Sequence, residues 1–276
     1  MENKQVQEVQ QHCLLILKEI KRICDKNEIK YFLVGGSALG AYRHKGFIPW
    51  DDDIDIAIYR SQYQYFLDVC KEELSSKFFL QNFGDNQDFI FPFAKIRLNN
   101  TAYVDKDLAH LAIHHGLYID VFPIDNIPEN RLLQSIQKNG LKLCNAIRMA
   151  KLGLKSPSAI KNIILGMFKL TIPKQLLPSL YTFFMEMASS KETFKCGNVV
   201  GAYIYEKEAM PKSYFGKGQM MKFEQMECRV PENIKLFLAH VYGPSYMTLP
   251  PIDQRKTHNP VVVSFSENYE ELEKIS

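Results

Sequence analysis

The sequence predicts an α/β (α+β) fold in which a mixed sheet is joined by a helical insertion and a C-terminal extension. Three observations lead to this class: β-prone runs alternate with helical patterns early in the chain, a long helical segment follows, and mixed patterning then returns. We therefore expect a core at 1–130, a basic helical insertion or lid at 131–195, and a part at 196–276 that completes the core and its site.

The first predicted element is an amphipathic helix from Lys4 to Asp25, where apolar residues recur at helical spacing. A short β-prone run from Tyr31 to Val34 follows and ends in the tripeptide Gly35-Gly36-Ser37. Helical patterning resumes directly after this tripeptide. The order strand, glycine turn, helix therefore opens the core.

Acidic and apolar residues alternate from Asp53 to Tyr59, which predicts a second strand, and Ser61 is placed to cap a helix that runs to about Leu74. Three more β-rich runs follow, at 78–83, 91–98 and 117–122. Pro123 and Pro128 then close this mixed α/β layer.

Charge and cysteine content exclude several classes of protein. The formal net charge of +3 over 276 residues is too small to indicate a nucleic-acid-binding protein, so we expect no nucleic-acid partner. The six cysteines are far apart and form no C-x-x-C pair, which predicts reduced core residues and neither a zinc site nor a disulfide framework. The polar N-terminus lacks a secretory signal, and we expect a cytoplasmic protein.

Two aspartates on the second predicted strand form the first candidate site. Successive side chains of a strand face opposite ways, so Asp53 and Asp55 share one face while Ile54 and Ile56 enter the core. Such a carboxylate pair repels itself unless a cation lies between, and hard oxygen ligands suit Mg²⁺ or Mn²⁺ holding substrate phosphates. The alternative is that residues 51–55 are only a solvated turn that enters a strand.

Two neighbouring features favour the cation site. Gly35 and Gly36 open a helix, where backbone N–H groups and the helix dipole attract a phosphate. Asp120 lies in the middle of a predicted apolar strand, where a carboxylate without a partner would be costly. We therefore expect Asp53, Asp55 and Asp120 to converge as catalytic residues and metal ligands.

Four stretches of the chain resemble one protein family. They are Gly35 to Gly40, Arg43 to Ile56, His115 to Asp125, and Tyr242 to Pro251 with Arg255 to His258 shortly after it. These stretches span nearly the whole chain, and they are similar to the motifs of the LicD family within the polymerase-β-like nucleotidyltransferase superfamily. The resemblance implies that fold for the mixed sheet, with 1–130 as its catalytic core.

The resemblance also implies a function. Members of the family are implied to transfer phosphocholine from CDP-choline to a sugar hydroxyl of a cell-surface glycan, such as a teichoic acid, lipopolysaccharide or capsule precursor. The fukutin-related protein transfers ribitol phosphate from CDP-ribitol, but its cysteine zinc site has no obvious match in this sequence. The bacterial choline-type branch therefore fits better.

The resemblance thus implies a phosphotransferase that uses Mg²⁺ or Mn²⁺, with Asp53 and Asp55 binding the metals and Asp120 completing the site. One alternative is a nucleotidyltransferase that moves NMP from NTP to a small acceptor. A second is a transferase of ribitol or glycerol phosphate from a CDP-alditol, and a third is a non-catalytic scaffold that kept the fold.

The substrate-binding candidates are more numerous than the acids. Lys95 and Arg97 share a face of one predicted strand, where they clamp donor phosphates or form a solvent-exposed basic edge. Trp50 is either a core residue or an aromatic that faces a quaternary ammonium, and Tyr246 offers the same cation-binding role. The complete set is Gly35, Gly36, Ser37, Arg43, Trp50, Lys95, Arg97, Tyr246, Lys256 and His258.

The segment at 131–185 has the strongest shift in composition, with nine basic residues and no acidic one. Apolar residues interleave with these cations, which predicts contact with an anionic, lipid-linked glycan acceptor or with the inner face of the cytoplasmic membrane. The alternative is a helical lid whose lysines are simply solvated.

Overall fold

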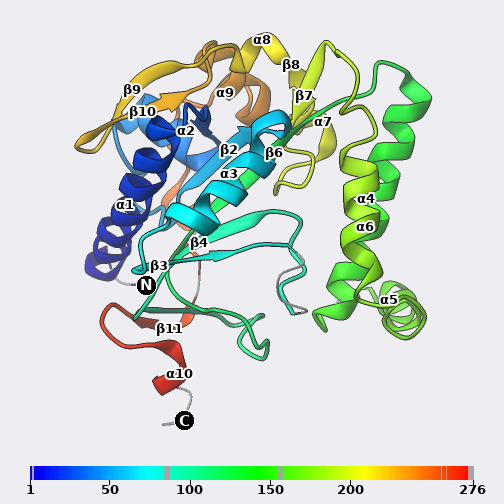
Figure 1. The fold of residues 1–276 in the computed structure, drawn as a ribbon, viewed down its shortest axis with the longest axis horizontal. Helices are drawn as coiled ribbons and strands as arrows, with labels where there is room; N and C mark the ends of the chain where they lie inside the picture. Colours follow the sequence, from blue (N-terminus) through cyan, green and yellow to red (C-terminus); the bar gives the residue numbers. More distant parts are fainter. Residues whose placement is uncertain (2, 84–87, 155–157, 256, 259, 273–276) are drawn as a thin grey trace.

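A mixed β-sheet forms the centre of the molecule (Figure 1). The structure is a computed structural model that describes residues 1, 3–83, 88–154, 158–255, 257–258 and 260–272. Within these residues, a seven-stranded sheet has the order β1–β2–β6–β4–β3, with β7 paired to β6 and β8 paired to β7. Its strands are β1 (Tyr31–Leu33), β2 (Asp55–Tyr59), β3 (Phe78–Gln81), β4 (Ala94–Leu98), β6 (Tyr118–Asn126), β7 (Lys195–Gly197) and β8 (Met210–Pro211).

The middle of this sheet pairs two strands in parallel. β2 runs parallel to β6, whereas β1, β3, β4, β7 and β8 are added in antiparallel pairs. In this register Asp55 lies opposite Asp120, and Asp120 lies opposite Lys95 on β4. Register partners project from the same face of a sheet. Three charged residues from separate segments therefore form a row across three strands.

Helices from the first part of the chain cover the sheet and enlarge its core. α1 (Asn3–Lys26) and α3 (Arg60–Glu73) contact each other and β6. α1 is amphipathic, and its fully buried stripe includes Ile16, Leu17 and Ile20. α2 (Gly35–His44) follows β1 directly and packs against α9 (Ile234–Tyr242).

Segments from the C-terminal part pack against the first half. The hairpin of β9 (Gln219–Phe223) and β10 (Met226–Val230) contacts β1, and β11 (Pro260–Ser264) pairs with β5 (Ala102–Asp105). Short elements complete this part: α7 (Tyr205–Glu208), α8 (Lys212–Phe215), η1 (Ile252–Gln254) and α10 (Tyr269–Leu272).

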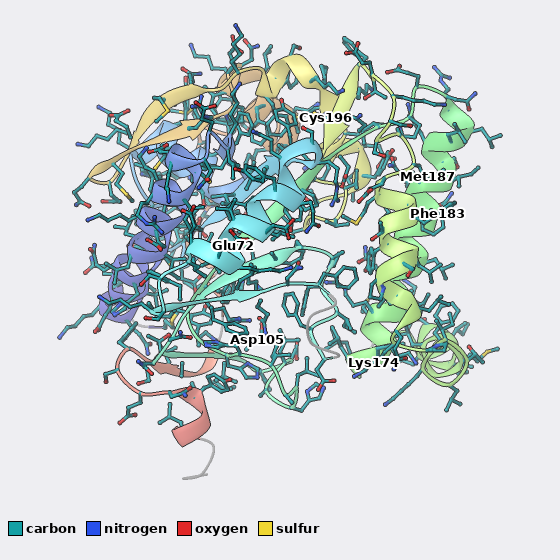
Figure 2. The ribbon with its side chains drawn as sticks, viewed as in Figure 1. Glu72, Asp105, Lys174, Phe183, Met187 and Cys196 are labelled. Atoms are coloured by element: carbon teal, nitrogen blue, oxygen red, sulfur yellow. The ribbon has the colours of Figure 1, made fainter. Side chains whose placement is uncertain are left out.

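Three helices form the basic segment beside the sheet (Figure 1). They are α4 (Arg131–Lys151), α5 (Ala159–Thr171) and α6 (Leu176–Met185). The buried Gln137 of α4 donates to the carbonyl of Phe184 at 3.0 Å, which ties α4 to α6. Lys174, labelled in Figure 2, pairs with Asp88 at 2.7 Å. In the part of the chain that the structure describes, no helix has both the length and the apolar character needed to cross a bilayer.

The fold class expected from the sequence is confirmed, since the mixed α/β architecture is consistent with an α+β nucleotidyltransferase-like fold. All six cysteines are buried, as expected for core residues. The helix at 4–25 and the strands near 31–34 and 117–122 are also present. The domain boundaries at 130 and 195 stay predictions.

Four local expectations were wrong. Pro123 does not close the layer, because it lies inside β6. α3 begins at Arg60 after an N-cap at Tyr59, so Ser61 lies inside the helix and does not cap it. The glycine tripeptide is itself the first turn of α2 and not a turn before it. Asp53 precedes β2, which starts only at Asp55. The errors at Ser61, the glycine tripeptide and Asp53 concern the exact ends of helices and strands, which local patterning determines least well.

Candidate active site

The three expected acids are brought together at one end of β2 and β6. Asp55 and Asp120 are register partners on these parallel strands, and Asp53 lies two residues before Asp55. Between the aspartates, Ile54 is fully buried and holds the backbone against the core. Burial raises the pKa of Asp55 well above its usual range, and the charges of Asp53 and Asp120 raise it further.

Asp51 belongs to the same cluster, although the sequence marked it only as part of a turn. Burial raises the pKa of Asp51 well above its ordinary value, and the nearby charges of Asp53 and Asp52 add to this. Asp51 and Asp53 also hydrogen-bond to each other. The alternative of a solvated turn is therefore wrong for these side chains, because they are mutually repelling and largely withdrawn from water. In the sequence, the unbroken run of aspartates at 51–53 is the signal that could have identified Asp51 as part of the cluster.

The two glycines of α2 make room for these carboxylates. A Cβ on Gly36 would lie 2.5 Å from Asp51 Oδ2, and a Cβ on Gly35 would lie 3.0 Å from Asp55 Oδ2. Gly35 also has a φ of +55°, which other residues rarely adopt. Ser37 Oγ accepts a hydrogen bond from the Asp55 N–H at 2.9 Å. The first turn of α2 therefore lies directly against the acids, where its dipole is attractive to negative charge.

His258 reaches the cluster from the C-terminal part of the chain. Its Nδ1 lies 3.0 Å from Asp52 Oδ1 and 3.9 Å from Asp53 Oδ2. Tyr103 donates a hydrogen bond to Asp52 Oδ2 at 2.5 Å. The hydrogen bond to Asp52 raises the pKa of His258 to about 9 against the opposing effect of burial, so the imidazole carries a charge at neutral pH.

Asp52, Asp53 and His258 form an acidic group whose ligand atoms all lie within 4.8 Å of one another, close enough to hold a metal ion. However, the nitrogen of His258 that faces the acids is already bonded to Asp52. In this arrangement the histidine and Asp52 act as an ion pair that supports Asp53. Asp52, which the sequence interpretation did not select, is almost completely buried in that role.

Lys95 belongs to the acid cluster, whereas Arg97 does not. Lys95 Nζ pairs with Asp120 Oδ1 at 2.5 Å and lies 3.5 Å from the ring centroid of Tyr118. The guanidinium of Arg97 instead donates to Gln81 Oε1 at 2.5 Å and to the carbonyl of Gly116 at 2.7 Å. Both cations are buried, so the solvent-exposed basic edge considered for them is wrong. Contacts with the protein interior occupy Arg97 in this structure.

A second group of candidates lines a groove of about 530 Å³ beside the outer end of α2. Arg43, Trp50 and Tyr246 all line it, and Arg43 donates to the carbonyl of Tyr246 at 2.9 Å. The Arg255 guanidinium lies 4.4 Å from the Trp50 ring centroid, so a cation already covers one face of that ring. Lys256 lies outside the described residues.

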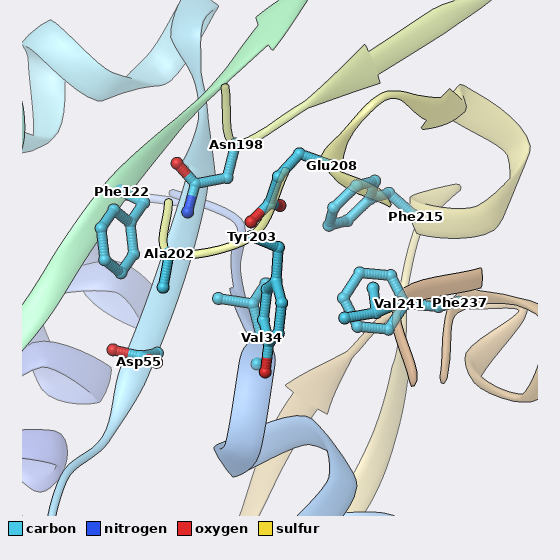
Figure 3. A pocket seen from close by; sticks show the side chains of 11 residues that line it. Val34, Asp55, Phe122, Asn198, Ala202, Tyr203, Glu208, Phe215, Phe237 and Val241 are labelled. Carbon is cyan, nitrogen blue, oxygen red and sulfur yellow. The ribbon is translucent and has the colours of Figure 1, made fainter. Parts of the chain in front are cut away.

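Asn198 and Glu208 form part of a further cavity that adjoins Asp55 (Figure 3). The sequence interpretation did not select them. Neither lies in a recognisable motif, and Glu208 stands among charged residues that look like an exposed helix. No local signal distinguished them.

A mixed sheet that carries clustered aspartates against the first turn of a helix is consistent with a nucleotidyltransferase-like fold. Residues 28–138 match the family model described as LicD/FKTN/FKRP, nucleotidyltransferase domain. Lipopolysaccharide cholinephosphotransferase LicD of Haemophilus influenzae is 30% identical, over 94% of this chain and 97% of its own length. The chain therefore belongs to the LicD family.

Two other relatives match shorter stretches. Human ribitol 5-phosphate transferase FKRP is 45% identical over 51 residues, which are 17% of this chain and 10% of that protein. The uncharacterized protein RP689 of Rickettsia prowazekii is 29% identical over 37% of this chain and 42% of its own length.

Proposed function

We propose that this protein is a metal-dependent phosphotransferase that moves phosphocholine from CDP-choline to a sugar hydroxyl of a cell-surface glycan. Kinship with a lipopolysaccharide cholinephosphotransferase over almost the whole chain supports the transfer of a phospho-substituent to a glycan. The observation that carries the proposal is the convergence of Asp53, Asp55 and Asp120 from two adjoining segments of the sheet.

The donor set fits a hard divalent cation. Carboxylate oxygens are the ligands that Mg²⁺ and Mn²⁺ prefer. Burial raises the pKa of Asp55, and the neighbouring charges of Asp53 and Asp120 raise it further, so a cation beside these carboxylates would be stabilising. Asp53, Asp55 and Asp120 would hold the ion. A bound divalent cation supplies charge neutralisation for phosphate oxygens and acidifies a coordinated hydroxyl.

The chain's own residues have separate tasks in this proposal. Lys95 neutralises Asp120 and orients its carboxylate, which accepts the proton of the acceptor hydroxyl. Gly35 and Gly36 allow the first turn of α2 to approach the donor phosphates. Ser37 fixes the backbone at Asp55 through its hydrogen bond to that N–H.

The groove lined by Arg43, Trp50 and Tyr246 is the proposed place of the cytidine nucleotide. Its volume of about 530 Å³ falls within the usual range of small-ligand sites. The guanidinium of Arg43 offers donors to an anionic nucleotide. Trp50 adjoins Asp51 in the sequence, so the groove and the acid cluster are linked through the same short segment.

Release of CMP tests the proposal. Purified protein would be incubated with CDP-choline, CDP-ethanolamine, CDP-ribitol, CDP-glycerol or CTP, with and without Mg²⁺ and a glycan acceptor, and products would be measured by mass spectrometry. We expect Mg²⁺-dependent CMP release from CDP-choline and a phosphocholine mass added to the acceptor. Pyrophosphate release from CTP would instead support the nucleotidyltransferase alternative, and CMP release from a CDP-alditol alone would support alditol phosphate transfer.

The exposed face of α5 supports a peripheral membrane contact as part of the same proposal. Ile160, Ile163, Met167 and Leu170 are 60–88% exposed and recur at helical spacing. Lys161 and Lys169 flank this stripe. An amphipathic helix of this kind lies in the interface of an anionic bilayer, where a lipid-linked acceptor would be found.

Sedimentation with anionic vesicles at low salt tests the membrane contact. We expect retention of the wild type and its loss in Leu170→Glu. Leu15→Glu, at an exposed position of α1, is the matched control and should sediment like the wild type. If the wild type stays in the supernatant, the proposed membrane contact is wrong, and the alternative of a helical lid with solvated lysines stands.

A further inference from the structure

We infer that the cavity beyond Asp55 receives the quaternary ammonium end of the transferred group. This inference rests on the proposed function and names the part of the substrate that the acid cluster does not contact. The cavity measures about 60 Å³ and is bounded by the start of α2, by β2 and β6, by the segment from Asn198 to α7, and by α8 and α9. Figure 3 shows its side chains, with the Asn198 carboxamide between Phe122 and Glu208.

Two buried polar side chains, Glu208 and Asn198, line this cavity. Glu208 is 8% exposed and has no ion pair among the described residues. Asn198 is equally buried, and its Oδ1 finds no hydrogen-bond partner in the part of the chain that the structure describes. Asp55 forms another wall, and none of the residues that line the cavity is basic. The carboxyl groups of Glu208 and Asp55 and the Oδ1 of Asn198, with no basic residue beside them, attract a positively charged ligand electrostatically.

Burial raises the pKa of Glu208 to about 8, even though a hydrogen bond from the backbone of Tyr203 lowers it. A cation beside Glu208 would favour the ionised form of this carboxyl group. Lys207 Nζ lies 5.9 Å from the Tyr203 ring centroid, but this side chain is not among the residues that line the cavity.

Aromatic rings form the remaining walls and determine which kind of cation fits. Phe122, Tyr203, Phe215 and Phe237 line the cavity, and the rings of Phe215 and Phe237 meet edge to face at 5.4 Å. A trimethylammonium group donates no strong hydrogen bond and is attracted to ring faces. A metal ion would need more oxygen ligands than this cavity offers. A primary ammonium also finds acceptors here, so the aromatic walls are what favour the quaternary group.

Position and size agree with this assignment. An ethylene bridge joins the phosphate to the nitrogen in phosphocholine, so the nitrogen site must adjoin the phosphate site, and Asp55 and Gly35 border both. A cavity of about 60 Å³ is far below the roughly 300–1,000 Å³ of sites for larger ligands. A compact headgroup therefore fits, whereas a nucleoside does not.

Binding of phosphocholine, measured by isothermal titration calorimetry in the presence of Mg²⁺, tests the inference without catalysis. We expect the wild type to bind phosphocholine more tightly than phosphoethanolamine or glycerol phosphate. Glu208→Gln, which keeps the shape and removes the charge, should weaken phosphocholine binding about tenfold and leave glycerol phosphate binding unchanged. Phe237→Leu should bring the affinities for phosphocholine and phosphoethanolamine closer together.

Glu227→Gln is the matched control, because Glu227 is exposed on the β9–β10 hairpin away from the cavity. Thermal melting identifies any variant that fails to fold, and Phe237→Tyr then replaces Phe237→Leu. Unchanged phosphocholine affinity in folded Glu208→Gln overturns the inference, while CMP release from CDP-choline by the wild type still supports the proposed function. If the wild type releases no CMP from CDP-choline, the proposed function fails, and selective phosphocholine binding that depends on Glu208 still supports the cavity.

Discussion

Asp55 of β2 and Asp120 of β6 are direct register partners on parallel strands, so their carboxylates leave the sheet side by side. Neither residue is close to the other in the sequence, and the pairing is created by the strand order alone. Lys95 of β4 lies opposite Asp120 on its other side. The first two predictions concern the charges of Asp55, Asp120 and Lys95 in this row.

Asp55→Asn should abolish phosphotransfer without unfolding the protein. Removal of one preorganised hydrogen-bond donor from an active site commonly costs on the order of 10²–10³-fold in rate, and loss of a carboxylate that binds the metal should cost at least as much. The pKa of Asp55 is raised in the folded state, so its contribution to stability is present at low pH and is lost as pH rises through the folded pKa. In the absence of divalent cations at pH 8, the variant should therefore melt no lower than the wild type.

Asp253→Asn serves as the control for this change, because Asp253 is exposed in η1. CMP release and thermal melting would be measured on both variants. Full transferase activity in Asp55→Asn contradicts the assignment of the acid cluster.

Lys95→Met should destabilise the protein strongly. The Lys95–Asp120 pair is largely shielded from water, and removal of one partner of a buried pair typically costs about 3–5 kcal/mol because the other charge is left uncompensated. The double variant Lys95→Met/Asp120→Asn should recover most of this loss. Urea denaturation of the single and double variants measures the coupling, and equal stabilities of the two would show that the pair does not matter.

Glu208 should make the protein less stable as pH rises. Its pKa is about 8 in the folded chain, whereas an unfolded glutamate has a pKa near 4.3. Between these values the folded state binds the proton and the unfolded state does not. The free energy of unfolding therefore falls as pH rises from about 4.3 to about 8, by at most about 1.4 kcal/mol per pH unit for one proton.

Glu208→Gln should remove this part of the pH dependence. Urea denaturation of wild type and variant across pH 5–9 would show converging stabilities at low pH and a more stable variant at high pH. Parallel curves would mean that the Glu208 carboxyl is not held protonated by its surroundings.

Gly36→Ala and Gly166→Ala should have opposite effects on stability. Glycine in a helix usually costs about 0.5–1 kcal/mol relative to alanine, and at Gly166 of α5 a Cβ meets nothing within 4 Å. Gly166→Ala should therefore stabilise the protein by about that amount. At Gly36 the Cβ would meet Asp51 Oδ2 at 2.5 Å, so Gly36→Ala should destabilise it and displace that carboxylate. A stabilising effect at both positions would contradict the close approach of Asp51 to α2.

The local sequence determined several elements and much of the candidate site. Alternation at 53–59 indicated a strand with acids on one face, and the buried Ile54 and Ile56 agree with it. The glycine tripeptide indicated a helix start where a phosphate can approach the backbone, and the structure adds that Gly35 and Gly36 lie directly against Asp55 and Asp51. Motif resemblance indicated the family that the comparison with LicD then showed.

Only the tertiary structure decided which residues meet. It paired Lys95 with Asp120, directed Arg97 to the interior, and brought His258 to Asp52 from more than two hundred residues away. It also placed Glu208 and Asn198 beside Asp55, although neither carries a local signal. The physical reason is that periodicity reports which face of an element is buried, whereas charge pairing and cavities depend on long-range packing, which local spacing does not encode.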